Sequence, residues 1–182
     1  MCGIVGYVGK RNANSVLLSG LKKLEYRGYD SCGIATLSGN NLNLFKSTNR
    51  IDSLVSEIIC TENPNIGIGH TRWATHGKVT IENAHPHLDN SKKIVVVHNG
   101  IIENYINLRE LLKEKGYKFY SETDTEIIPN LISMFYDGNL LKAVKKATDM
   151  LSGSFALVVM FKRKSKRTCS NKEKQPPNNW FR

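Results

Sequence analysis

The sequence has no apolar run that approaches the roughly 18 residues needed to cross a bilayer, so it predicts no membrane span. Its first ten residues, MCGIVGYVGK, lack the basic start and the long apolar stretch of a secretory signal peptide. The chain has only four cysteines, spaced far apart and without a CxxC pair, namely Cys2, Cys32, Cys60 and Cys169. This spacing argues against a zinc site and a disulfide scaffold. We therefore expect a cytoplasmic protein without a metal or another cofactor.

Acidic residues are scarce at one end of the chain only. The formal net charge is +10, from 26 Lys and Arg against 16 Asp and Glu. Residues 162–182 hold eight Lys or Arg and one Glu, so this segment carries +7 and residues 1–161 carry +3. The segment also lacks apolar periodicity, which is typical of disorder. We expect a nearly neutral globular part over 1–161 and a basic, disordered tail over 162–182.

Within 1–161, short apolar and β-branched runs alternate with segments of helical periodicity. Strands and helices occur in pairs, which favours α+β layers over a doubly wound parallel sheet. The segment 71–93 has no period and is expected to be a long loop of the kind that carries function. The expected strands are 3–8, 33–37, 42–46, 66–70, 94–98, 117–121 and 154–161, and the expected helices are 14–26, 51–60, 104–115, 123–136 and 140–151.

The spacing of Thr123 and Glu126 is that of a capping box, which predicts a helix start at this point. Asp124 would then lie in the first turn, where an acidic side chain commonly caps the helix. A functional alternative is that the Asp124 carboxylate binds an ammonium group.

Cys2 directly follows Met1. If the initiator methionine is removed, one residue carries a thiol and a free α-amino group. That amine has an ordinary pKa of about 7.7–8.0 and can act as the base for its own thiol. N-terminal nucleophiles use this pairing. Alone, a cysteine at position two is most often incidental, but the apolar strand that follows would hold it in place.

Two further motifs place polar groups at the ends of predicted strands. GHTRWATHG (69–77) contains Arg72, whose planar fork suits a carboxylate, and Trp73, which could cover a bound ligand. HNG (98–100) offers the Asn99 amide and the Gly100 N–H as donors to an oxyanion. The alternatives are a solvated loop for the first motif and a simple turn for the second. His76, His85 and His87 are better explained as solvated or hydrogen-bonded histidines than as metal ligands.

Taken together, these groups match the needs of an amino-acid substrate. Six motifs occur in order: MCGIVGYVG, LEYRGYDSCGIA, GHTRWATHG, NAHPH, VVVHNGIIEN and SETDTE. In this order and spacing they resemble the class II glutamine amidotransferases, and in particular the glutaminase domain of glutamine–fructose-6-phosphate aminotransferases (isomerising). The resemblance runs from Met1 to about Phe161.

The resemblance implies an N-terminal-nucleophile hydrolase fold, a four-layer αββα sandwich with antiparallel sheets. It implies glutamine as substrate and Cys2 as nucleophile and base. It also implies roles for nine further residues: Asn99 and Gly100 in the oxyanion hole, Arg72 on the glutamine carboxylate, Asp124 on its amino group, and Trp73, Thr75, His76, Arg27 and Gly28 around the substrate.

The resemblance also implies differences. In the family, two sugar-isomerase domains bind fructose 6-phosphate, and nothing in this sequence resembles them. Fructose 6-phosphate would be reached only through such domains, the family's homodimer contacts would be lost, and we expect no specific nucleic-acid partner. The abrupt change after Phe161 predicts a fold incomplete at its C-terminal end and a truncated or frameshifted reading frame. The alternatives are an inert or partner-dependent fragment and a module that binds acidic surfaces through its basic tail.

Overall fold

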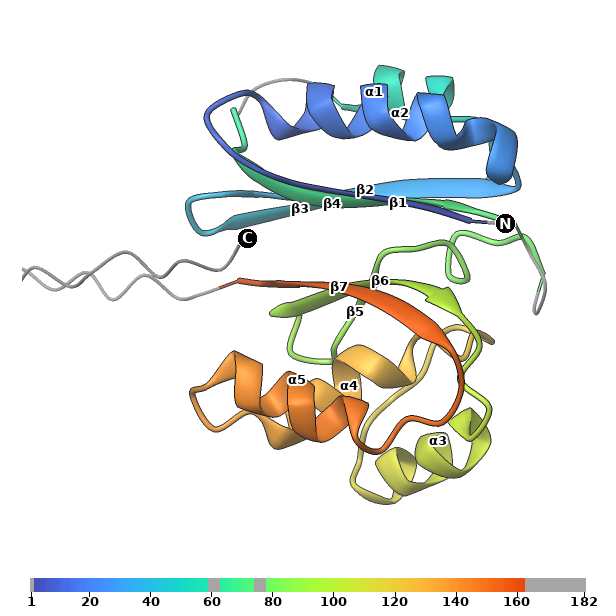
Figure 1. Ribbon diagram of the computed structural model, residues 1–182, viewed down its shortest axis with the longest axis vertical. Helices are drawn as coiled ribbons and strands as arrows, with labels where there is room; N and C mark the ends of the chain where they lie inside the picture. The colour runs from blue at the N-terminus through green and yellow to red at the C-terminus, as the bar shows by residue number, and fades with distance from the viewer. Residues whose placement is uncertain (1, 59–62, 74–77, 163–182) are drawn as a thin grey trace, which may run out of the picture.

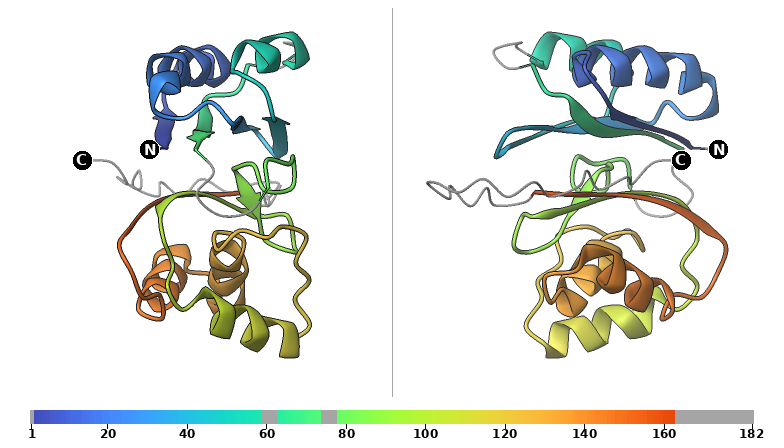
Figure 2. Two further views of the ribbon diagram at one scale, coloured as in Figure 1. Left: turned by 90° about the vertical axis from the view of Figure 1, so that its right-hand side faces the viewer. Right: turned by 60° about the vertical axis from the view of Figure 1, so that its left-hand side comes forward.

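The structure is a computed structural model that describes residues 2–58, 63–73 and 78–162. Two antiparallel sheets lie face to face, and helices cover the outer face of each (Figure 1). Two further views show the same order of layers, with the sheets inside (Figure 2). The expected α+β sandwich of antiparallel sheets between helical layers is confirmed.

The first sheet has the order β1 (Gly3–Val8), β4 (Ile66–Arg72), β2 (Ser31–Ser38) and β3 (Asn41–Ser47). All three strand pairs are antiparallel. Its outer face is covered by α1 (Ala13–Leu24) and α2 (Asp52–Glu57), and the short 3-10 helix η1 (Glu25–Arg27) follows α1. The buried side chains between these helices and the sheet are Leu17, Leu21, Cys32, Ile34, Ile51, Leu54 and Ile58.

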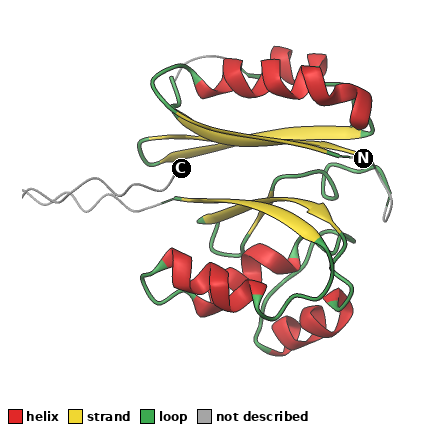
Figure 3. Ribbon diagram, in the orientation of Figure 1, coloured by secondary structure: helices red, strands yellow, loops and turns green. Residues whose placement is uncertain are grey.

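The second sheet has the order β5 (His87–Leu88), β6 (Ile94–Gly100) and β7 (Phe155–Phe161), again antiparallel. Three helices cover its outer face (Figure 3): α3 (Tyr105–Glu114), α4 (Ile127–Phe135) and α5 (Leu140–Thr148).

The alternation of side chains along β6 explains why this strand sits at the centre of the molecule. Ile94 and Val96 pack toward the helices, whereas Val95 and Val97 pack into the layer between the sheets. All four are buried, so the strand is apolar on both faces and matches its continuous run in the sequence. By the same alternation, Asn99 continues the face that looks toward the first sheet.

The expected strand over 117–121 is wrong, because backbone N–H groups in this segment bond to side chains. The N–H groups of Tyr120 and Ser121 donate to the Glu126 carboxylate at 2.9 and 2.7 Å, and Lys118 N donates to Asn90 Oδ1 at 2.7 Å. The segment is therefore irregular.

The expected capping box is also wrong. The Glu126 carboxylate bonds to residues 120 and 121, and α4 begins at Ile127 without a side-chain cap. The expected loop 71–93 is shorter than predicted, since Thr71 and Arg72 belong to β4 and His87–Leu88 forms β5. Within the ranges that the structure describes, no helix is long and apolar enough to cross a membrane.

Candidate active site

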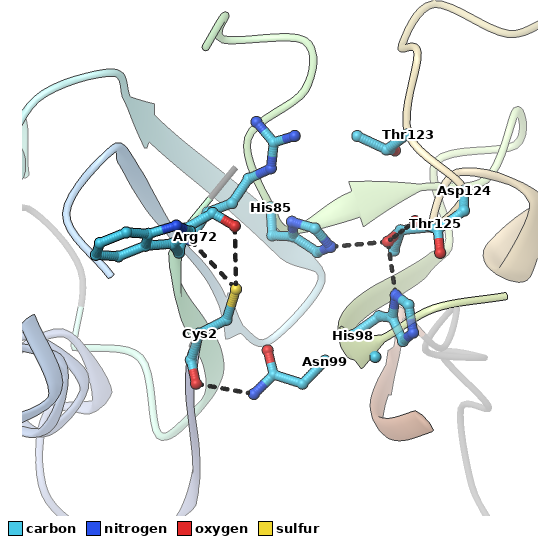
Figure 4. A pocket seen from close by; sticks show the side chains of 10 residues that line it. Cys2, Arg72, His85, His98, Asn99, Thr123, Asp124 and Thr125 are labelled. Carbon is cyan, nitrogen blue, oxygen red and sulfur yellow. Dashed lines mark hydrogen bonds between the residues drawn. The ribbon is translucent and has the colours of Figure 1, made fainter. Parts of the chain in front are cut away.

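A pocket opens where β1 begins, β4 and β6 end, and the chain approaches α4 (Figure 4). Both sheets contribute to it, because the ends of β4 and β6 lie at the same edge of the sandwich. The residues that line it are Cys2, Arg72, Trp73, His85, His98, Asn99, Gly100, Thr123, Asp124 and Thr125. Six of the predicted site residues are among them.

Cys2 is held at the pocket by the pairing of β1 with β4. That pairing begins at Gly3 opposite Thr71, and Gly3 N also donates to Thr71 Oγ1 at 3.1 Å. Trp73 N donates to the Cys2 thiol sulfur at 3.2 Å. The first described residue of the chain is thus fixed to a strand end, with its sulfur next to a backbone N–H.

The Asn99 side chain lies next to Cys2. Its Nδ2 donates to the carbonyl oxygen of Cys2 at 3.2 Å, and its Oδ1 lies 2.8 Å from His70 Nε2. Gly100 follows with φ +130°, and a Cβ at this position would collide with the Ser154 carbonyl oxygen. Position 100 therefore requires glycine, and its backbone lies at the pocket beside the Asn99 amide.

Arg72 is a buried cation at the end of β4. Its Nη1 donates to the Lys78 carbonyl at 3.3 Å. Burial lowers the pKa of the guanidinium, and the nearby Cys2, Asp30 and Asp124 act in the opposite direction. An arginine retains its charge under such shifts, so the pocket contains a fixed positive group.

Asp124 is not in the first turn of a helix, because α4 begins three residues later. Its Oδ2 accepts a hydrogen bond from Ile102 N at 2.8 Å, and its Oδ1 accepts one from Thr125 Oγ1 at 3.4 Å. The carboxylate is thereby tied to the segment that follows β6 and placed at the pocket. The capping alternative for this residue is wrong.

The remaining predicted residues differ in where they lie. Gly28 backs onto the Arg72–Trp73 peptide, since a Cβ there would lie 2.9 Å from the Arg72 carbonyl carbon. Arg27 directly precedes it in η1. Trp73 is 42% exposed and makes an edge contact with Tyr29, with 5.3 Å between ring centroids. Thr75 and His76 lie outside the described residues.

Sequence reasoning did not predict that four buried histidines, His70, His85, His87 and His98, form one group at the pocket, two of which (His85 and His98) line it. The rings of His70 and His85 stack at 4.1 Å, and His85 lies at 4.8 Å from His87 and 6.5 Å from His98. Burial lowers the pKa of His70 to about 4 and lowers the pKa of the other three. All four are therefore neutral at pH 7. The described residues contain no set of His, Cys, Asp and Glu side chains that could hold a metal.

The pocket thus combines a thiol, an amide donor, a cation and a carboxylate within one layered αββα fold. This is the arrangement of an N-terminal-nucleophile amidohydrolase. The sequence model of the family described as "Glutamine amidotransferase domain" matches residues 70–173, more than half of the chain. The chain belongs to this family, and the resemblance drawn from its motifs is confirmed.

Curated relatives named glutamine–fructose-6-phosphate aminotransferase [isomerizing] match nearly the whole chain. The protein of Clostridium acetobutylicum is 53% identical over 179 residues, which cover 97% of this chain and 29% of the relative. The protein of Clostridium perfringens is 56% identical over 163 residues, 88% of this chain and 26% of the relative. The chain therefore spans less than a third of the length of these relatives.

Solved structures support the same fold. Glutamine phosphoribosylpyrophosphate amidotransferase from B. subtilis, complexed with ADP and GMP, aligns with a TM-score of 0.77 and 26% identity over 89% of this chain and 35% of its own. A structure titled as the allosteric regulatory enzyme of purine biosynthesis aligns with a TM-score of 0.79 and 26% identity, over 89% of this chain and 36% of its own. The N-terminal-nucleophile hydrolase fold implied by the motifs is confirmed.

Proposed function

We propose that this chain hydrolyses the side-chain amide of glutamine to glutamate and ammonia, with the Cys2 thiol as nucleophile. The observation that carries the proposal is the convergence on one pocket of Cys2, Asn99, Arg72 and Asp124 from both sheets. An amino-acid amide presents a carbonyl, a carboxylate and an ammonium group, and each has a partner of suitable chemistry there.

The first step is attack of the Cys2 sulfur on the glutamine Cδ. The α-amino group of Cys2, free after removal of Met1, accepts the thiol proton and passes it to the departing ammonia. The product is a thioester between Cys2 and the glutamyl group. Water then attacks the thioester, which releases glutamate and restores the thiol.

Negative charge develops on the carbonyl oxygen of the amide in the first attack and of the thioester in the second. We assign its stabilisation to Asn99 Nδ2 and to the backbone N–H of Gly100. Asn99 already lies beside the nucleophile, with Nδ2 3.2 Å from the Cys2 carbonyl oxygen. The φ of +130° at Gly100 turns the chain at this point.

Arg72 and Asp124 are assigned to the two ends of the amino-acid backbone. The Arg72 guanidinium would bind the glutamine α-carboxylate through its planar fork, and the Asp124 carboxylate would bind the α-ammonium group. Trp73 would cover the bound substrate. Thr75, His76, Arg27 and Gly28 complete the proposed substrate contacts.

We further propose that the ammonia serves the conversion of fructose 6-phosphate to glucosamine 6-phosphate, the first step of amino-sugar formation, in the cytoplasm. The names of the relatives support this acceptor. The sugar chemistry would belong to parts of those proteins that this chain does not match. Within this chain, residues 1–161 would form the glutaminase domain and 162–182 a separate basic segment.

The test measures glutamate, ammonia and amino sugar separately, with the purified chain, glutamine and fructose 6-phosphate. We expect glutamate and ammonia in equal amounts and no amino sugar. Cys2→Ala and retention of Met1 should each abolish glutamate release, whereas Cys32→Ala should preserve it. Equal activity in the Cys2→Ala protein would refute the proposal.

Chemical labelling provides a second test. A glutamine analogue with an electrophilic group should modify Cys2 and leave Cys32 unmodified. Cys32 is buried, and burial raises the pKa of its thiol to about 12, so the reactive thiolate is scarce. Mass spectrometry of the labelled peptides would show which thiol reacts, and labelling spread over every cysteine would argue against an activated Cys2.

A further inference from the structure

Three of the buried histidines contact residues that form the pocket. His70 lies at 2.8 Å from Asn99 Oδ1. His98 Nδ1 and His85 Nε2 lie at 2.8 and 3.0 Å from the same atom, Thr125 Oγ1, as the dashed lines in Figure 4 show. Each ring has one further nitrogen, and these atoms, His70 Nδ1, His85 Nδ1 and His98 Nε2, are buried without a hydrogen-bond partner among the residues that the structure describes.

The unpartnered nitrogens determine where the protons lie on His85 and His98. A buried N–H without an acceptor is rarer and more costly than a buried lone pair without a donor. The unpartnered nitrogens are therefore lone pairs, and the N–H groups point at Thr125 Oγ1. A hydroxyl that accepts from both rings has its own proton left to donate, and the remaining neighbour is Asp124 Oδ1 at 3.4 Å.

The same reasoning applies to His70 and does not depend on the first case. The Cys2 carbonyl can only accept, so the Asn99 atom that faces it must be Nδ2. Oδ1 then faces His70, whose Nε2 must carry the proton. The unpartnered His70 Nδ1 is again a lone pair, and a single orientation of the Asn99 amide results.

Protonation of His85 or His98 would create a buried N–H without an acceptor among the described residues. Burial is also the main reason that the pKa of each ring is lowered. Arg72 and Lys46 add positive charge near the rings. Hydrogen bonds to Asn99 and to the His98 backbone act in the opposite direction on the pKa of His70, and the charge of Asp124 does so on the pKa of His98. The three rings therefore act as neutral, singly protonated donors, and none of them is left to serve as a catalytic acid or base.

We propose that His70 is a positioning residue for the oxyanion donor Asn99, and that His85 and His98 position Thr125, which in turn orients Asp124 toward the substrate ammonium group. This inference rests on the proposed function, because it assigns Asn99 and Asp124 their roles in glutamine hydrolysis. It divides the histidines into two branches with different kinetic consequences. The stacked rings of His70 and His85 join the two branches.

The two branches predict opposite kinetic signatures. Loss of the His70 donor frees the Asn99 amide to turn, so kcat should fall by about 10- to 100-fold with little change in KM, below the 10²- to 10³-fold effect of losing an oxyanion donor outright. Thr125→Val leaves Asp124 without its hydroxyl partner, so KM for glutamine should rise about tenfold with a small change in kcat.

Replacement of His70 and of His98 by either asparagine or glutamine tests which ring nitrogen carries the proton. The side-chain amide of glutamine reaches about as far as a histidine Nε2, and that of asparagine about as far as Nδ1. His70→Gln and His98→Asn should therefore retain most activity. His70→Asn should lower kcat, and His98→Gln should raise KM for glutamine. The reverse pattern, or equal losses for all four variants, would overturn the proposal.

Thr36→Val is the matched control for Thr125→Val. Thr36 is another fully buried threonine, and its hydroxyl has no hydrogen-bond partner among the described residues, so its removal should leave KM and kcat unchanged. Thr125→Ser keeps the hydroxyl and should restore the wild-type KM. An increase in KM in the Thr36→Val protein as large as that of Thr125→Val would show a general packing effect and refute the Thr125 branch.

Nitrogen-15 NMR of the histidine rings tests the assignment without activity. At pH 7.5 we expect the Nε2–H tautomer for His70 and His85 and the Nδ1–H tautomer for His98. An Nε2–H tautomer at His98 would refute its branch. If the wild-type chain does not hydrolyse glutamine but the tautomers are as expected, the proposed function fails while the hydrogen-bond network stands.

Discussion

Mild acid should destabilise this protein through its buried histidines before its carboxylates titrate. The pKa of His70 is about 4 in the folded chain, against about 6.5 for an exposed histidine. Between these values the unfolded chain binds a proton that the folded chain does not, so the free energy of unfolding falls as the pH falls. The loss begins near pH 6.5 and is complete near pH 4.

The size of the effect follows from the two pKa values. At pH 5, His70 alone should lower the free energy of unfolding by about 2 kcal/mol. The pKa values of His85 and His87 are also lowered by burial, so their contributions have the same sign. For a domain whose stability is of the order of 5–15 kcal/mol, this is a large fraction. Exposed aspartates and glutamates have pKa values of about 3.9 and 4.3, so they remain mostly ionised at pH 5.

The assay is urea unfolding followed by far-UV circular dichroism at several pH values from 7.5 to 5. We expect the stability of the wild-type chain to fall over this range with a slope of more than one proton per molecule. His70→Gln should reduce that slope by about one proton, or about 1.4 kcal/mol per pH unit. A stability that is flat from pH 7.5 to 5, or an unchanged slope in the variant, would refute the assignment of neutral histidines.

Three substitutions in the pocket give further predictions. Arg72→Lys keeps the charge but loses the planar fork, so we expect KM for glutamine to rise about tenfold with a smaller change in kcat. Steady-state kinetics that show no change in KM would exclude the role of Arg72 in binding the carboxylate. Asp124→Asn should raise KM similarly by removing the charge opposite the ammonium group, and the same kinetics test it. Gly100→Ala should lower the free energy of unfolding by at least about 1–2 kcal/mol, because φ is +130° and the added methyl group collides with the Ser154 carbonyl oxygen. A denaturant midpoint equal to that of the wild type would contradict this.

Much of the fold could be predicted from local patterns. The apolar runs at 3–8 and 94–98 correspond to β1 and β6. For β6 the reason is that a strand buried on both faces leaves a continuous apolar signature. The error at 117–121 has a specific cause. Its alternating residues resemble a strand, but the buried Glu126 carboxylate binds the N–H groups of Tyr120 and Ser121, and a side chain that competes for backbone donors leaves no periodic signal.

Some residues of the candidate site could likewise be predicted from the sequence, and others could not. Arg72, Asn99 and Asp124 could be proposed because their chemistry suits an amino-acid substrate and each stands in a short motif. His70 and Thr125 could not, since their roles depend on partners 29 and 27 residues away in the chain. The packing of the two sheets brings His70 to Asn99, whereas Thr125 meets His98 because the segment before α4 lies against β6. No spacing in the sequence encodes either contact.

Under the proposed function, the rate of glutamine hydrolysis depends on how the two sheets are aligned with each other. Arg72 belongs to the first sheet and Cys2 directly precedes its strand β1, whereas Asn99 belongs to the second sheet and Asp124 to the segment before α4. The layer that joins them consists of side chains such as Val97. If substitutions weakened the packing of that layer, both sheets could keep their hydrogen bonds while the distance between Cys2 and Asn99 increased. A small displacement of one sheet relative to the other would then lower the rate of glutamine hydrolysis while the spectroscopic signal of secondary structure stayed unchanged.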